Sequence, residues 1–255
     1  MQAGLQLAQV IDHGMHAQAV QFQGGVGGLV DFGARTLSLA LLRSHPHSPA
    51  EHLRFLCTRI TLREALQQLE TEGLVYRENR RGWFVAPPRI RYNPTRTTGF
   101  MEYVSAQGRQ PRTETLHAER RAAGAWLAKR MGLEDSAPVY FLQRRRWVDE
   151  RPVLIELIAL DAGWCPGLLD HDLDTSLMSL LRERFGLQPT RCQLAMHPTA
   201  LNAAQAEPLQ LAPGSPALYL ERLSYAEGQR VVEFDQEFWR PDALEIVLDA
   251  AYPGA

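Results

Sequence analysis

Two arginines and one glutamate stand in segments that otherwise have the composition of buried strands. Arg144 and Arg146 are two positions apart in a segment flanked by apolar residues, so their side chains point to the same face of an extended chain. Glu156 interrupts the apolar run PVLIELIAL over 152–160. Charges in buried strands are costly unless they are paired or bind a ligand. These three residues therefore predict either an ion pair or a binding site.

Both alternatives have a chemical basis. If residues 149–151 form the loop of a hairpin, Arg144 lies directly opposite Glu156, and the two side chains form a cross-strand ion pair. Alternatively, the two arginines fork onto an anionic group of a small ligand, and Glu156 accepts a hydrogen bond from one of its hydroxyl or amino groups. The residues alone leave both readings open.

A second charged region suggests a polyanionic partner. The formal net charge of the chain is −2, but residues 59–96 hold eight arginines against four glutamates. This segment therefore carries +4 and the remainder −6. Such asymmetry indicates one basic module on a more acidic body.

The basic region has the pattern of a helix followed by a hairpin. Thr58 or Thr61 can cap a helix that Gly73 ends. Its apolar stripe has the spacing of a helix face that packs on a core, and it consists of Leu62, Ala65, Leu66 and Leu69. Extended segments over 74–78 and 83–87 follow, and Asn79 to Gly82 form a plausible hairpin tip between them.

A helix start ahead of this pattern completes a DNA-binding arrangement. Ser48-Pro49-Ala50-Glu51 has the form of a capping box and predicts a short helix through Leu56. Two helices joined by a short turn are typical of a helix-turn-helix, and a hairpin after them is typical of a winged helix. The residues expected to contact DNA at the groove, the phosphates or the wing are Arg59, Thr61, Arg63, Arg80, Arg81 and Gly82.

The remaining chain predicts a second domain. Residues 1–87 are assigned to the winged-helix domain, with 1–57 as its divergent part. The spacing of apolar residues predicts a helix over 4–20, and the glycine-rich patch over 24–30 predicts a flexible turn. The proline-rich, basic stretch over 88–97 predicts an extended linker. Beyond it, residues 98–255 predict helices and strands in mixture: helices at 119–131 and 175–185, and strands near 138–148, 152–160, 190–197, 216–225 and 230–239.

The two halves resemble two known domains. TRITLREAL over 58–66, LETEGLV over 69–75 and RRGWFV over 80–85 are similar to the DNA-binding domain of the GntR family of bacterial regulators. The second half resembles the UTRA effector-binding domain. The shared residues are Gly108 and Pro111, Arg144 and Arg146, Pro152 and Glu156, Pro166-Gly167-Leu168, Ser176-Leu177, Pro213-Gly214, Glu233 and Trp239-Arg240.

The resemblance implies a fold, partners and a site. It implies an α+β protein, in which a winged helix-turn-helix is joined to a mixed α/β domain with the chorismate lyase-like fold. It also implies a homodimer on a palindromic DNA operator, with a small-molecule effector bound by Arg144, Arg146, Glu156, Ser176, Glu233 and Trp239. The strings RRGWFVAPPRIRYNPTR (80–96) and DQEFWRPDA (235–243) look most like the phosphonate-responsive branch. An anionic effector such as aminoethylphosphonate is therefore expected. The alternatives are phosphorylated or amino sugars, and carboxylate or histidine-pathway metabolites.

One departure from the family supports another function. The segment from Ser48 to Arg59 is about one residue shorter than the family pattern, and residues 24–47 barely resemble it. A one-residue deletion rotates a helix face by about 100°. The alternative is therefore a ligand-sensing protein with impaired DNA binding, and more distantly a lyase-like enzyme.

Several other function classes find no support in the sequence. No run of about 18 uncharged apolar residues and no signal-peptide pattern occur, so a cytoplasmic protein without membrane contact is expected. Cys57, Cys165 and Cys192 stand far apart, which fits reduced, buried thiols rather than a disulfide or zinc site. No GxSxG, HExxH or paired-carboxylate motif is present, so neither catalysis nor a metal or other cofactor is expected.

Overall fold

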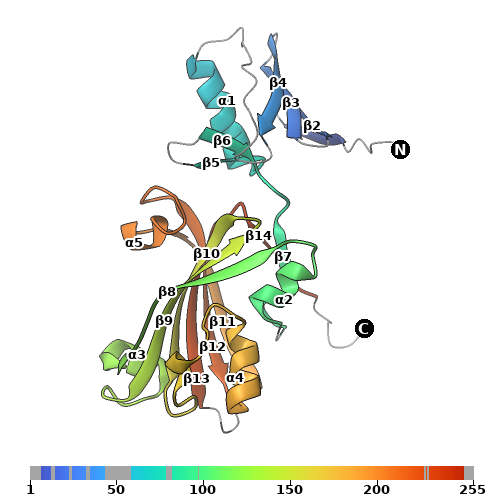
Figure 1. Cartoon of the computed structure of the whole chain (residues 1–255). Coiled ribbons are helices and arrows are strands. Elements are labelled where there is room, and N and C mark those ends of the chain that lie inside the picture. Colours follow the sequence, from blue (N-terminus) through green and yellow to red (C-terminus); the bar gives the residue numbers. More distant parts are fainter. Residues whose placement is uncertain are drawn as a thin grey trace, which may run out of the picture. The chain divides into compact units, whose positions relative to one another are not determined.

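The chain forms two compact units, Met1–Pro88 and Arg89–Ala255. The computed structural model describes residues 7–12, 15–22, 25–32, 35–43, 59–78, 82–96, 98–226, 228 and 230–249 (Figure 1). Among these residues, no helix has the length and apolar character needed to cross a membrane.

The first unit begins with an antiparallel four-stranded sheet in the order β1-β2-β3-β4. Its strands are β1 (Leu7–Asp12), β2 (Met15–Phe22), β3 (Gly25–Phe32) and β4 (Arg35–Arg43). The predicted helix over 4–20 and the predicted turn over 24–30 are therefore wrong. MHAQA over 15–19 also alternates with a period of two, and each two-residue connection contains a glycine, as tight hairpins favour.

A helix and a hairpin follow in the basic region. Helix α1 (Arg59–Thr71) buries Leu66 and Leu69, as the apolar stripe predicts. Gly73, with φ 75°, closes the helix end, and Leu74 N donates to Leu69 O at 2.9 Å. The hairpin pairs β5 (Val75–Glu78) with β6 (Gly82–Val85). The helix expected to open at Ser48 and the hairpin tip over 79–81 lie outside the described residues.

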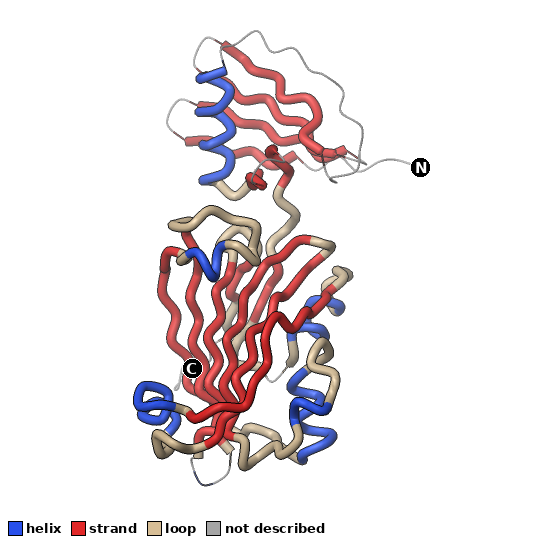
Figure 2. Tube along the Cα trace, turned by 60° about the vertical axis from the view of Figure 1, so that its left-hand side comes forward, coloured by secondary structure: helices blue, strands red, loops and turns tan. Residues whose placement is uncertain are grey.

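The second unit is built on a six-stranded antiparallel sheet in the order β11-β12-β13-β10-β9-β8 (Figure 2). Its strands are β8 (Pro111–Ala122), β9 (Pro138–Val148), β10 (Arg151–Asp161), β11 (Arg191–Ala200), β12 (Pro216–Tyr225) and β13 (Val231–Trp239). Five of the six strands correspond to predicted ones, and β8 does not. The helix expected over 119–131 is shorter, because residues 119–122 belong to β8, where they pair with β9.

Helices cover both faces of this sheet. Helices α2 (Phe100–Ser105) and α4 (Leu177–Phe185) pack on one face through Phe100, Leu177 and Leu181. Helix α3 (Gly124–Met131) packs on the opposite face through Leu127 and Met131. The 3-10 helix η1 (Leu168–Asp170) and the short α5 (Ala203–Ala206) lie in loops. Because side chains alternate along each strand, the two faces are free to have different chemistry.

The predicted linker over 88–97 is partly ordered within the second unit. Strand β7 (Ile90–Tyr92) pairs in parallel with β14 (Leu244–Ile246). Ile90 and Tyr92 are buried against Phe100 and Trp239, while Arg91 between them is exposed. The alternation of apolar and charged residues in IRY explains this strand, since two apolar side chains enter the core.

The cysteines differ in their surroundings. Cys165 is fully buried, and burial raises the pKa of its thiol to about 12. Cys192 is exposed, so the expectation that all three thiols are buried is wrong. Cys57 lies outside the described residues.

The register of the central hairpin is set by a tight turn and a bulge. Asp149 and Glu150 connect β9 to β10 with φ values of 48° and 63°. An irregularity between Pro152 and Leu154 then shifts the register by one residue, which places Glu156 opposite Arg144. The predicted cross-strand pair is thus present, but a two-residue turn with a bulge produces it rather than a three-residue loop.

The turn allows a test of backbone strain. A left-handed backbone costs a residue with a Cβ roughly 1–2 kcal/mol, and glycine avoids this cost. We expect Glu150→Gly to raise the free energy of unfolding by about 0.5–1 kcal/mol in urea denaturation. As a control, Glu183→Gly in α4 should lower it by about 1 kcal/mol. A lower stability for Glu150→Gly would contradict this account of the turn.

Candidate functional site

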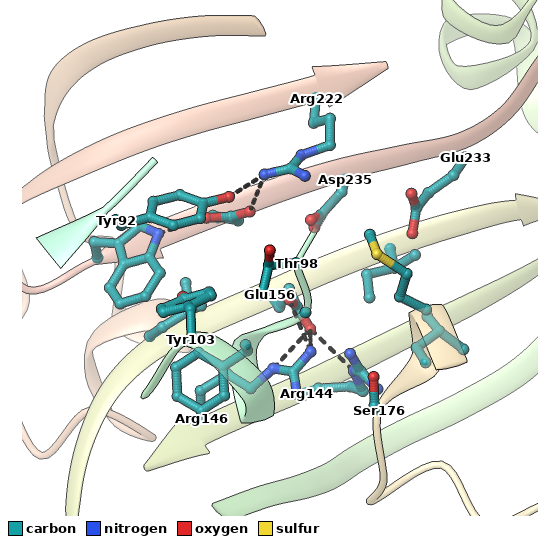
Figure 3. A pocket seen from close by; sticks show the side chains of 18 residues that line it. Tyr92, Thr98, Tyr103, Arg144, Arg146, Glu156, Ser176, Arg222, Glu233 and Asp235 are labelled. Atoms are coloured by element: carbon teal, nitrogen blue, oxygen red, sulfur yellow. Dashed lines mark hydrogen bonds and ion pairs between the residues drawn. The ribbon is translucent and has the colours of Figure 1, made fainter. Parts of the chain in front are cut away.

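A cavity of about 70 Å³ lies on the sheet face that α2 and α4 cover. Strands β9, β10, β12 and β13 supply its charged wall, and β7, α2 and the start of α4 complete it (Figure 3). All of the residues predicted for ligand binding line this cavity: Arg144, Arg146, Glu156, Ser176, Glu233 and Trp239.

Glu156 is held by two guanidinium groups. Arg144 Nε donates to Glu156 Oε2 at 2.9 Å, and Arg146 donates from Nε to Oε2 and from Nη2 to Oε1, both at 3.1 Å. Burial alone raises the pKa of this carboxyl, but the charges of Arg146 and Arg144 outweigh burial and lower it to about 2. Glu156 is therefore ionised at neutral pH.

The two arginines also donate hydrogen bonds to neighbouring elements of the cavity wall. Arg144 Nη1 donates to Leu173 O at 3.1 Å, and Arg146 Nη1 donates to Thr113 Oγ1 at 2.5 Å. Their side chains are only 1% and 5% exposed. The ion pair predicted as one alternative is thus formed, and its three residues also line the cavity. Because two guanidiniums face one carboxylate, this cluster retains one positive charge.

Ser176 lies where α4 begins. Its Oγ accepts a hydrogen bond from Ser179 N at 3.3 Å, which caps the helix. A Cβ added to Gly99 would lie 3.1 Å from Ser176 Oγ, so the chain after β7 passes close to this hydroxyl. Ser176, Leu177 and Met178 line the cavity, so the N-terminal end of α4, with its partial positive charge, borders it.

An acidic column runs along β13 on the same face. Glu233, Asp235 and Glu237 alternate along the strand, and burial is the main cause that raises the pKa of each carboxyl. Glu233 Oε2 accepts from Ser224 Oγ at 2.9 Å, and Glu237 Oε2 accepts from Trp239 Nε1 at 2.5 Å. Asp235 Oδ1 is buried without a hydrogen-bond partner among the described residues.

Arg222 and Tyr92 belong to the site but were absent from the sequence prediction. Arg222 Nη2 donates to Tyr92 Oη and lies 3.5 Å from Glu237 Oε1. Burial, followed by the charge of Glu237, raises the pKa of Tyr92 well above its ordinary value. Arg222 interrupts an apolar strand just as Arg144 does, and Asp235 and Glu237 share the two-residue spacing of Glu233. The two-residue period of β12 and β13 therefore indicates Arg222, Asp235 and Glu237 as residues of the site.

The residues expected to contact DNA lie in the first unit. Arg59 and Thr61 are in the first turn of α1, and Arg63 follows with an exposed side chain. Gly82 begins β6 with φ 112° and is exposed. Arg80 and Arg81 lie outside the described residues.

Loss of the hydrogen bonds from Arg144 and Arg146 to Glu156 is expected to lower the stability of the protein strongly. Glu156→Gln leaves two buried guanidiniums without a counter-charge, which costs about 3–5 kcal/mol of unfolding free energy. The carboxylate contributes above its ordinary pKa of 4.5 and loses its contribution as pH falls toward 2. Urea denaturation at pH 7 and pH 3 should therefore show a smaller difference between wild type and variant at pH 3. The exposed control Glu183→Gln should change stability by less than about 0.5 kcal/mol.

The contribution of Asp235 to the stability of the folded protein is expected to depend on pH in the opposite direction. Burial, with Glu156, Glu237 and Glu233 nearby, raises the pKa of this carboxyl well above its ordinary value, and Arg222 only partly offsets this. A raised acid pKa means that the folded protein loses stability as pH rises from the unfolded value to the folded one. We expect Asp235→Asn to gain stability relative to wild type between pH 4 and pH 8 in thermal melts. The exposed control Asp135→Asn should show no such trend, and a constant difference for Asp235→Asn would contradict the assignment.

Comparison with known protein families finds a match within each unit. The UTRA domain model matches residues 106–245, and the model of the gntR family of bacterial regulatory proteins matches residues 54–85. The crystal structure of PhnF from Mycobacterium smegmatis superposes with a TM-score of 0.61 at 29% identity, covering 76% of this chain and 86% of that chain.

Curated relatives align with about three quarters of the chain. The HTH-type transcriptional regulator GgaR of Escherichia coli (strain K12) is 28% identical over 75% of this chain and 76% of its own length. The HTH-type transcriptional repressor NagR of Bacillus subtilis (strain 168) is 24% identical over 76% of this chain and 80% of its own length. These relatives are regulators rather than enzymes. The chain belongs to the GntR family and carries a UTRA domain, and it is a DNA-binding transcriptional regulator of that type.

Proposed function

We propose that a small anionic metabolite binds in the cavity of the second unit and controls the affinity of this regulator for its DNA operator. One observation carries the proposal: the cavity wall includes Tyr92, Thr98, Gly99, Phe100 and Tyr103. These residues follow closely after Pro88, where the first unit ends. A ligand that contacts them acts on the segment that leads directly to the DNA-binding unit.

The cluster of Arg144, Glu156 and Arg146 supports an anionic ligand. It retains one positive charge, and the N-terminal end of α4 at Ser176 adds a partial positive charge. Arg144 Nη2 makes no hydrogen bond to the described residues, while Nε and Nη1 are engaged. An anionic oxygen in the cavity gains from both sources without displacing Glu156.

The size of the cavity favours a compact effector. Pockets for drug-sized ligands measure roughly 300–1,000 Å³, whereas this cavity has about 70 Å³. A phosphonate such as aminoethylphosphonate is therefore the first candidate. A sugar phosphate is the second, because an adjoining pocket of about 130 Å³ shares Met178 and Arg222 with the cavity and adds Arg182 and Arg191.

For the DNA partner, we propose that a homodimer in the cytoplasm binds a palindromic operator. Arg59, Thr61 and Arg63 at the start of α1 then meet the major groove or its phosphates. Arg80, Arg81 and Gly82 form the wing and reach the adjacent minor groove, where the negative potential favours arginine.

A second candidate function is a ligand sensor with impaired DNA binding. It is favoured by the β1–β4 sheet, which forms where a helix over 4–20 was predicted within the winged-helix domain. The two candidates share the effector cavity and differ only in DNA affinity.

A gel shift on the DNA upstream of the gene separates the two candidates. The regulator should form a complex that weakens steeply between 50 and 200 mM salt. Arg63→Ala should weaken it further and reduce the salt slope by about one unit, whereas the matched control Arg184→Ala, an exposed arginine of α4, should not. Absence of any salt-sensitive complex would favour the impaired sensor.

The same assay tests effector control. A probe that stabilises the protein in thermal melts should change operator affinity by about 5- to 150-fold, which is the usual range of allosteric coupling. A probe that binds without altering the complex would contradict control by this cavity.

A further inference from the structure

We propose that the acidic column of β13 forms a subsite for a protonated amine. The effector is then a zwitterion, with its amine against Asp235 and Glu237 and its anionic group against Arg144 and Arg146. This inference rests on the proposed function of the cavity as the effector site, and it adds the second charge that the effector must carry.

The sheet register brings the acidic groups together. Glu237 is paired with Glu156 across β10, and Asp235 is paired with Arg222 across β12. Carboxylate oxygens of Glu156, Asp235 and Glu237 lie within 4.8 Å of one another. In Figure 3, Asp235 and Glu233 lie on one side of Glu156, and Arg144 and Ser176 lie on the other. The cavity is therefore acidic at one end and basic at the other.

The acidic end has three carboxyl groups and one guanidinium group. Arg222 is the guanidinium at this end, and it is engaged by Tyr92 Oη and by Glu237 Oε1. Asp235 is 6% exposed, and its Oδ1 has no hydrogen-bond partner among the described residues although it borders the cavity. A buried acceptor of this kind is costly to leave unpaired. Asp235 shares a hydrogen bond with the carboxyl group of Glu237, and a cationic donor bound between the two carboxylates takes the place of that shared proton.

An ammonium group fits this position better than a divalent metal ion. Calcium and magnesium need six or more oxygen ligands. Of the three clustered carboxylates, only Asp235 and Glu237 are not bound by Arg144 and Arg146. Arg144 and Arg146 also contact Glu156 directly, so a divalent ion bound there is repelled by both. An ammonium carries one charge and three donors, which match Asp235 Oδ1 and its acidic neighbours.

The test compares ligands that differ only in the amine. We expect isothermal titration at pH 7.5 to show that 2-aminoethylphosphonate binds about tenfold or more tightly than ethylphosphonate, the gain expected of charge-assisted hydrogen bonds. Glucosamine 6-phosphate and glucose 6-phosphate form a second matched pair for a longer effector. Asp235→Asn should remove most of the preference for the amine, measured as the ratio of the affinities of the two members of a pair.

Control variants protect this test from folding defects. Asp135→Asn, at an exposed carboxylate, should keep the full preference, and Glu237→Gln should weaken it as Asp235→Asn does. The amine preference is compared only for variants that retain the wild-type circular dichroism spectrum. One folded variant of the two, Asp235→Asn or Glu237→Gln, is sufficient to test the amine subsite.

The outcomes separate the two proposals. If the amine-free partner binds as tightly as the amine, the amine subsite is overturned while the effector cavity stands. If neither member of either pair binds at 10 mM, both proposals are overturned. If magnesium chloride stabilises the wild type but not Asp235→Asn, and amines have no effect, the column is a metal site and the amine subsite is wrong.

Discussion

The ion-pair cluster of Arg144, Glu156 and Arg146 is the interaction on which the second unit depends. It removes three charges from water in the middle of the sheet, and such burial is tolerated only when every group finds a partner. The cluster also connects separate elements, because Arg146 bonds Thr113 of β8 and Arg144 bonds the carbonyl of Leu173 ahead of α4. The same contacts that satisfy the charges therefore fix the walls of the cavity.

Alternation along the strands allows one sheet to hold a charged site and an apolar core at once. On β13, Phe234 and Phe238 enter the core clusters of one face, while the carboxylates between them face the cavity. On the charged face, Arg144 and Arg146 lie on β9 and the acidic column lies on β13, with Glu156 of β10 between them and Arg222 of β12 beyond the column. The polarity of the cavity from basic to acidic is thus a direct result of strand order.

Much of the second unit could be predicted from local pattern. The strands with near-continuous apolar runs were predicted with small errors at their ends, and charges within them indicated the site. Strand β8 was missed because PRTETLHAERRA is polar on both faces and becomes a strand only by pairing with β9. Arg222 and Asp235 were not predicted because they lie outside the positions shared with the family, although each is a charge within an apolar strand, as Arg144 and Glu156 are.

The first unit shows the limit of periodicity in short segments. Leu7, Val10, Ile11 and Met15 have helical spacing, yet the chain over 7–43 forms hairpins. Frequent glycines weaken a helix by about 1 kcal/mol each and favour tight turns, so they outweigh a sparse apolar stripe. Helix α1, in contrast, has four apolar residues over two turns and contains no glycine.

Tyr92 links the chemistry of the cavity to the rest of the chain. Its ring stacks on Tyr103 with centroids 4.9 Å apart and lies 6.0 Å from the ring of Trp239, and its hydroxyl accepts from Arg222. It is also part of β7, which begins two residues after Pro88. A ligand shifts a conformational equilibrium only by its difference in affinity between two states. A zwitterion that occupies both ends of the cavity changes the field around Arg222, and hence around the Tyr92 hydroxyl, in a way that a simple anion at the basic end does not. The acidic end is therefore the part of the cavity where ligand charge acts most directly on the segment that joins the two units.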